Sequence, residues 1–152
     1  MSAFGRVAAA AFHRWKGDSG LAAYSHALLL SPGVQVWETV PSPDSKHVKD
    51  GTLPTPRYPR LVMGEVTEVQ RSVMQLAQGW TDTLTVDVWS QYPGRFELQG
   101  IVPLVHAAVR EPLTVAGFGT VTLRPELTVT LRDPSGLFHA PIRYRFTAWE
   151  QA

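Results

Sequence analysis

The chain has 152 residues, 44% of them hydrophobic and 18% charged, which is the composition of one globular domain with a buried core. We therefore expect a single domain over residues 1–152. A formal net charge of +1 excludes recognition of nucleic acid or anionic lipid through a strong overall field, and the lack of cysteine excludes disulfides, thiolate metal ligands and cysteine nucleophiles. The apolar run at residues 7–12 is too short for a signal peptide or a membrane span, so we expect synthesis in the cytosol and no membrane contact.

The N-terminal quarter predicts two helices and a strand. Apolar side chains recur every three to four residues between residues 4 and 16, which places them on one helical stripe that ends at Gly17. The stripe consists of Phe4, Val7, Ala8, Ala11, Phe12 and Trp15. The alanine- and leucine-rich segment 21–30, followed by Ser31-Pro32-Gly33, predicts a second, shorter helix. Alternating valines then predict a strand over residues 34–40.

Residues 41–57 (PSPDSKHVKDGTLPTPR), which we call the arm, predict a long exposed loop. The segment has four prolines, little apolar content and neither helical nor strand periodicity. It cannot compensate the entropy of its own ordering by burying apolar surface. Because loops of this length are uncommon in compact domains and are often functional, the arm is either a partner-contacting segment or a plain mobile loop.

The middle of the chain predicts two strands and a helix that covers them. Residues 58–69 are rich in strand-forming side chains, with Gly64 as a bulge or a point of close approach. Residues 80–90 alternate apolar side chains with Thr and Asp, so one face of this strand should meet the core. Residues 98–109 return to helical spacing, and Pro103 should kink this helix.

The C-terminal third predicts an antiparallel hairpin. Residues 121–131 alternate apolar and polar side chains, and Pro125 marks an edge strand or a bulge. Residues 133–136 (DPSG) suit a type I turn, and residues 138–147 form the return strand. The inward face of the first strand is expected to comprise Val121, Leu123, Leu127, Val129 and Leu131. Together the elements predict an α+β domain, in which amphipathic helices pack on one face of a mostly antiparallel sheet that ends in a C-terminal β-hairpin.

The sequence contains no pattern typical of a catalytic, cofactor or metal site. The five histidines lie on separate elements without metal-ligand spacing. Residues 17–20 (GDSG) resemble a serine-protease turn but have no room upstream for the partner residues, and Gly117 with Gly119 forms a turn between strands rather than a phosphate-binding loop. We therefore predict no enzyme, no cofactor and no metal ion.

Polar strand faces, a proline-interrupted edge strand and the arm are instead typical of a module that meets other chains. Arg143 and Arg145 are expected on the outward face of the last strand, where they are either phosphate contacts or ordinary surface charge. The candidate contacts with other subunits or partners are the basic side chains Lys46, His47, Lys49, Arg57, Arg124, Arg143 and Arg145.

Three blocks of the sequence resemble the tail completion proteins of tailed phages and prophages, which are also called tail terminators or tail-to-head joining proteins. The blocks are residues 58–65 (YPRLVMGE), 84–95 (LTVDVWSQYPGR) and 131–136 (LRDPSG). The middle block is the most specific, because a strand that ends in Trp-Ser is followed by Tyr, a break, Gly-Arg and an amphipathic helix. Length and element order also match, so the resemblance covers nearly the whole chain. The long, proline-rich arm and Pro103 depart from the family pattern.

The resemblance implies a virion structural protein without catalytic activity. Similar proteins form a homohexameric ring that caps the head-proximal end of a tail tube and docks it to the head connector. The implied partners are further copies of the chain, the major tail-tube protein and a head-connector or stopper protein, with DNA only passing through the lumen. Such a protein is made in the bacterial host cytoplasm and belongs to the tail of a siphophage-like particle or a gene transfer particle. The alternatives are a stopper or adaptor of the head-tail connector, or a small binding domain or hydrolase with a pocket between helix and sheet.

Overall fold

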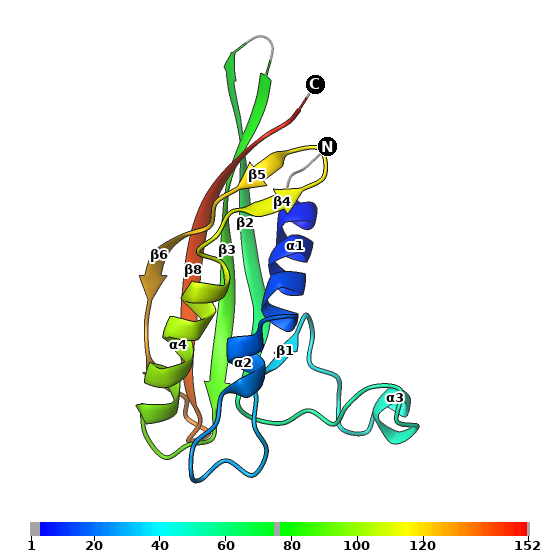
Figure 1. Ribbon diagram of the computed structural model, residues 1–152, viewed down its shortest axis with the longest axis vertical. Helices are drawn as coiled ribbons and strands as arrows, with labels where there is room; N and C mark the ends of the chain where they lie inside the picture. The colour runs from blue at the N-terminus through cyan, green and yellow to red at the C-terminus, as the bar shows by residue number, and fades with distance from the viewer. Residues whose placement is uncertain (1–3, 75–76, 152) are drawn as a thin grey trace.

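The computed structural model describes residues 4–74 and 77–151 (Figure 1). In chain order the elements are α1 (Phe4–Lys16), α2 (Ser19–Ala23), β1 (Gln35–Trp37), α3 (Lys46–Lys49), β2 (Arg60–Met74), β3 (Ala77–Ser90), α4 (Phe96–Ala108), β4 (Leu113–Val115), β5 (Gly119–Val121), β6 (Arg124–Thr128), β7 (Leu131–Arg132) and β8 (Phe138–Trp149). Most of the strands form one sheet with α1, α2 and α4 on one side of it, so the predicted α+β class is confirmed.

The main sheet has the strand order β1-β2-β3-β8-β6, and β7 pairs with β8. β1 runs parallel to β2, whereas the other neighbouring strands are antiparallel. β2 and β3 are longer than the sequence predicts, because they continue together beyond α1 at the upper end of Figure 1. The register of this pair shifts between Met63 and Val66, which places a bulge at Gly64 as predicted.

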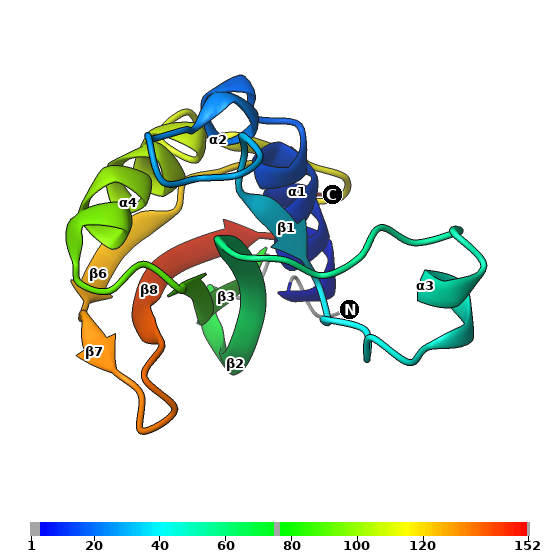
Figure 2. The ribbon, with the colours of Figure 1, turned by 90° about the horizontal axis from the view of Figure 1, so that it is seen from below.

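The core lies between the helices and the curved inner face of the sheet (Figure 2). Val7, Ala11 and Trp15 of the predicted stripe are fully buried, and the side chain of Phe4 lies outside the described residues. The indole Nε1–H of Trp15 donates to the carbonyl of Val105 at 3.0 Å and so joins α1 to α4. The backbone N–H of Gly17 donates to His13 and ends α1 where the sequence predicts.

The predicted helix over residues 21–30 is wrong beyond Ala23. Asp18 caps α2 by accepting a hydrogen bond from the backbone N–H of Leu21 at 2.9 Å, but Tyr24 already has an extended backbone with ψ of 130°. Residues 24–34 form a loop at the lower end of the molecule (Figure 1). Leu28, Leu29 and Leu30, which the sequence places in the predicted helix, therefore lie in this loop.

The predicted strand over residues 121–131 is divided into parts of β5, β6 and β7, and its inward face is wrong after Pro125. A register shift between Pro125 and Leu127 inserts a bulge, and all five side chains of β6 are exposed. Leu127 and Leu131 are 49% and 43% exposed. The predicted edge position of Pro125 is confirmed, as is the turn at residues 133–136, where Gly136 N–H donates to the carbonyl of Asp133 at 2.9 Å.

Two smaller differences concern short elements. The arm contains a one-turn helix, α3, although its sequence has no helical period. Its N-terminus is capped by the Ser45 hydroxyl, which accepts from the N–H of His47. The hairpin of β4 and β5 was not predicted as a pair of strands, but the turn between them at Gly117 and Gly119 was.

Candidate subunit-contact surfaces

The arm extends away from the rest of the molecule on the side of α1 (Figures 1 and 2). No residue between 41 and 57 is buried, yet its tip is held in one shape by internal hydrogen bonds. The Thr52 hydroxyl lies 2.7 Å from Asp50 and 3.0 Å from the carbonyl of His47. The predicted contact residues Lys46, His47 and Lys49 are exposed on α3. The tip is therefore an ordered, uncovered surface.

The base of the arm is fixed to the body by Arg57. Its guanidinium donates to the carbonyl of Gly33 at 2.9 Å and to that of Pro32 at 3.0 Å. Its backbone N–H donates to the side chain of Gln35, which in turn donates to the carbonyl of Thr55. Arg57 thus makes its charge-assisted bonds inside its own subunit, so it positions the arm rather than presenting a free cation.

The other predicted contact residues lie together on the outer face of the sheet, which is turned away from the helices. Arg124 on β6 is the register partner of Arg145 on β8, and Arg143 lies two residues earlier on the same strand. Arg145 forms a 2.5 Å ion pair with Glu126 in the β6 bulge. Among the described residues, Arg124 and Arg143 have no acidic partner. The structure therefore forms two groups of candidates, one on the arm and one on β6 and β8 at the opposite side (Figure 2).

A buried polar cluster that the sequence did not predict holds the loop of residues 24–34 against α4. The carboxylate of Glu97 is only 3% exposed and accepts from His26 Nε2–H at 2.5 Å and from the Ser90 hydroxyl at 2.7 Å. The other nitrogen of His26 accepts the backbone N–H of Leu28 at 3.2 Å, which assigns the proton to Nε2. Burial, and secondarily the charge of Glu97, raises the pKa of the neighbouring Tyr24. Every polar atom of this cluster thus has a structural partner.

The same cluster lacks the geometry of a hydrolase. In a nucleophile-base pair the serine hydroxyl donates to the histidine, but Ser90 donates to Glu97 and is itself fully buried. The Ser90 oxygen also accepts the backbone N–H of Tyr92 at 3.1 Å, so it supports the turn before α4. The cluster therefore has a structural role, because it holds the loop of residues 24–34 against α4.

The loop that this cluster fixes presents large apolar side chains to solvent. Leu28 is 68% exposed, Leu30 is completely exposed, and Phe96 at the start of α4 is 60% exposed. We call these three residues the leucine patch. Tyr92 packs beside Phe96 with ring centroids 5.6 Å apart and lines one groove with Leu28 and Leu30. Exposed apolar side chains gathered in this way mark interaction sites.

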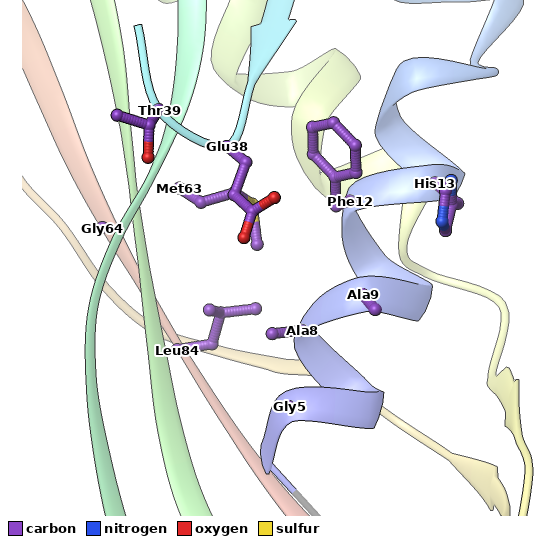
Figure 3. Close-up of a pocket in the computed structure, with 10 residues that line it drawn as sticks. All are labelled: Gly5, Ala8, Ala9, Phe12, His13, Glu38, Thr39, Met63, Gly64 and Leu84. Atoms are coloured by element: carbon purple, nitrogen blue, oxygen red, sulfur yellow. The ribbon is translucent and has the colours of Figure 1, made fainter.

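A groove of about 490 Å³ separates α1 from the sheet (Figure 3). Ala8 and Phe12 face Met63 and Leu84 across it, and the Glu38 carboxylate lies at its mouth. His13 points away on the other side of the helix. The polar lining of the groove is limited to Glu38, Thr39 and the outward-pointing His13, which is not the nucleophile, base and orienting group of a catalytic site.

The structure contains a second half-buried histidine, His106, and its two ring nitrogens also have partners within the chain. Nδ1 of His106 lies 2.8 Å from the Tyr144 hydroxyl, and Nε2 lies 3.5 Å from the Thr128 hydroxyl. Burial lowers the pKa of His106 and raises that of Tyr144. In the described part of the chain, no group of three His, Asp or Glu side chains is placed to hold a metal ion, and no helix there has the length and apolar character needed to cross a membrane.

An α+β fold with an uncovered arm and an exposed apolar patch offers surfaces for contact with other proteins. Comparison with known proteins agrees with this interpretation. The family model of tail completion protein gp17 matches residues 21–148, and the chain belongs to this family. It is therefore a structural component of a virion tail.

Two further comparisons bear on the fold. A solved chain from the virion of a native gene transfer agent particle superposes with a TM-score of 0.74 at 18% identity, and the match covers 97% of this chain and 98% of that one. At this identity the match establishes a shared fold over essentially the whole chain. No curated protein sequence matches the chain significantly.

Proposed function

We propose that copies of this chain assemble into a homohexameric ring at the head-proximal end of a phage-like tail. The ring ends the tail tube and joins it to the head connector, and DNA passes through its lumen. In this proposal the whole chain, residues 1–152, is the repeating domain of the ring. The partners are the neighbouring copies, the major tail-tube protein and a connector or stopper protein.

The observation that carries the proposal is the arm. A closed ring needs a heterologous interface, in which two different surfaces of one subunit are complementary. The arm is ordered by its own hydrogen bonds, has no buried residue and leaves the molecule on the flank opposite β6. In an isolated subunit such a segment has no structural purpose, whereas in a ring it reaches the next copy.

In this proposal six of the predicted basic side chains contact other chains, and the seventh positions the arm. Lys46, His47 and Lys49 lie on the arm tip, where they contact the neighbouring subunit or the tube. Arg124, Arg143 and Arg145 make the outer face of β6 and β8 a second, polar contact surface. Arg57 positions the arm.

The proposal is tested by native mass spectrometry and negative-stain microscopy of the purified chain, alone and with the tail-tube protein of the same particle. We expect one species with the mass of six chains, or a ring that appears at the tube end when tube protein is added. A monomer at every concentration that also leaves tube ends bare would refute the proposal. Binding to the head connector without binding to the tube would instead identify a stopper or adaptor.

A further inference from the structure

The leucine patch is pre-organised for a partner. His26, Glu97 and Ser90 hold the loop of residues 24–34 against α4 through buried hydrogen bonds, while Leu28 and Leu30 point away from the core. A flexible loop would collapse its leucines onto the nearest apolar surface. Holding the side chains in their exposed positions lowers the entropy that a partner must remove on binding.

The arm tip is the apolar surface on the opposite flank. Leu53 is 38% exposed and lines a groove of its own chain together with Phe12 and Trp37. Val48 on α3 is half-buried. Both surfaces lie at the lower end of Figure 1, with the arm on one side and the start of α4 on the other. Figure 2 shows the same separation from below. Two different surfaces at one level on opposite flanks are what a heterologous ring contact requires.

Charge complementarity agrees with this pairing. Arg95 is exposed next to Phe96 and has no acidic partner among the described residues. On the arm tip Asp50 is exposed and has no basic partner in the described part of the chain. Hydrogen bonds from the Thr52 backbone N–H and hydroxyl lower the pKa of Asp50, so this carboxylate stays ionised. An arm tip on the leucine patch brings an unpaired carboxylate to an unpaired guanidinium.

We propose that the arm tip of one copy, residues 46–54, docks on the leucine patch of the next copy in the ring. Leu53 packs between Leu30 and Phe96, and Asp50 pairs with Arg95. Arg57 bonds the base of the arm to the carbonyls of Pro32 and Gly33, which belong to the loop that carries Leu28 and Leu30. The arm and the leucine patch of one copy are therefore held in a fixed orientation to each other. The angle between them sets the rotation from one copy to the next. This inference rests on the ring proposed above.

The natural chain has no cysteine, so engineered thiols report single contacts. Two differently tagged variants, Leu53→Cys and Leu30→Cys, are mixed in the presence of tube protein and treated with a short bismaleimide. We expect a cross-linked dimer that carries both tags, and a ladder of higher species when both substitutions are in one chain. The control pair replaces Leu30→Cys by Leu131→Cys, which is also exposed but lies on β7, and should give no such dimer.

Charge removal tests the same contact without cysteines. Asp50→Asn, which keeps an acceptor oxygen for the Thr52 N–H and hydroxyl, and Arg95→Gln should each reduce ring assembly at least tenfold. The double variant should reduce it no further than either single one, and all three should keep the melting temperature of the natural chain. Intact rings without cross-links between Leu53→Cys and Leu30→Cys would overturn this inference and leave the ring standing. Dimers formed by Leu30→Cys alone would also overturn it, because the patch would then pair with itself. The absence of any ring would overturn both proposals.

Discussion

The stability of the loop that presents the leucine patch should depend on a single buried carboxylate, and Glu97→Gln tests this. The natural carboxylate accepts two side-chain hydrogen bonds, from His26 and Ser90. Charge-assisted bonds contribute about 1.5–3 kcal/mol each, and neutral ones about 0.5–1.5 kcal/mol. Glutamine keeps the volume but has one acceptor oxygen, so it accepts one of the two bonds as a neutral bond and places its NH2 group, a donor, where the second acceptor was. Because the substitution also removes the desolvation cost of a charge, we expect a net loss of about 2 kcal/mol.

For a domain of this size, a loss of about 2 kcal/mol lowers the melting temperature by about 4–8 °C. The matched control is Glu111→Gln, an exposed carboxylate for which we expect a change within about 0.5 kcal/mol. Urea unfolding gives the free energies, and amide hydrogen exchange locates the effect. Exchange should accelerate at Leu28 and Leu29, whose N–H groups donate to His26. If the two variants are equally stable, or if exchange at the loop is unchanged, the cluster does not fix the loop.

Three further outcomes follow from the contacts described. Burial lowers the pKa of His106 in the folded chain below the unfolded value of 6.5, so the unfolded chain binds the proton more readily. The contribution of His106 to the free energy of unfolding is therefore fully present above about pH 6.5 and is lost as the pH falls. In His106→Asn, the free energy of unfolding measured in urea should decrease less between about pH 7.5 and 5.5 than in the natural chain. An unchanged pH dependence would assign the decrease to other groups. Gly33→Ala should cost about 2 kcal/mol or more, because φ is +98° and the new Cβ would lie 2.8 Å from the carbonyl oxygen of Ala22; Gly51→Ala, with φ of +81° and open space around it, should cost only about 1 kcal/mol. Replacing Pro43–Pro54 by a short Gly/Ser linker should shift the melting temperature by no more than about 2 °C but abolish joining of tails to heads, since no residue of the arm is buried; a large thermal shift would show that the arm supports the core.

Local patterns predicted the elements that depend on near neighbours in the sequence. The helical stripe of α1 and the alternation of β3 and β8 each follow from one period and one buried face, and both are present in the structure. Pro125 was correctly placed at a sheet edge, since proline lacks the N–H that a central strand needs. The arm was also recognisable, because its composition offers no apolar face.

Features set by distant partners were not predictable in this way. Residues 24–30 have a helix-compatible composition, but His26 is bound to a carboxylate 71 residues further along the chain. The outward turn of Leu127 depends on a bulge whose position only the pairing with β8 determines. The bonds of Arg57 to Pro32 and Gly33 likewise could not be read from its basic charge, which predicts only a contact residue. The arm was identified from the sequence alone, but the patch opposite it required the structure.

The two edges of the sheet explain why loops carry the contacts in this proposal. A long free edge strand would pair with another copy through its backbone and extend the sheet without limit. Here β1 has three residues and packs against α1, and β6 has five residues, a proline and a bulge. β6 is therefore a poor template for strand addition, and β1 covers β2 at Arg60–Val62. In the proposed ring, side chains on an arm and a fixed loop make the contacts. Such a contact sets one angle between neighbouring copies, and it closes into a ring when that angle divides a full turn.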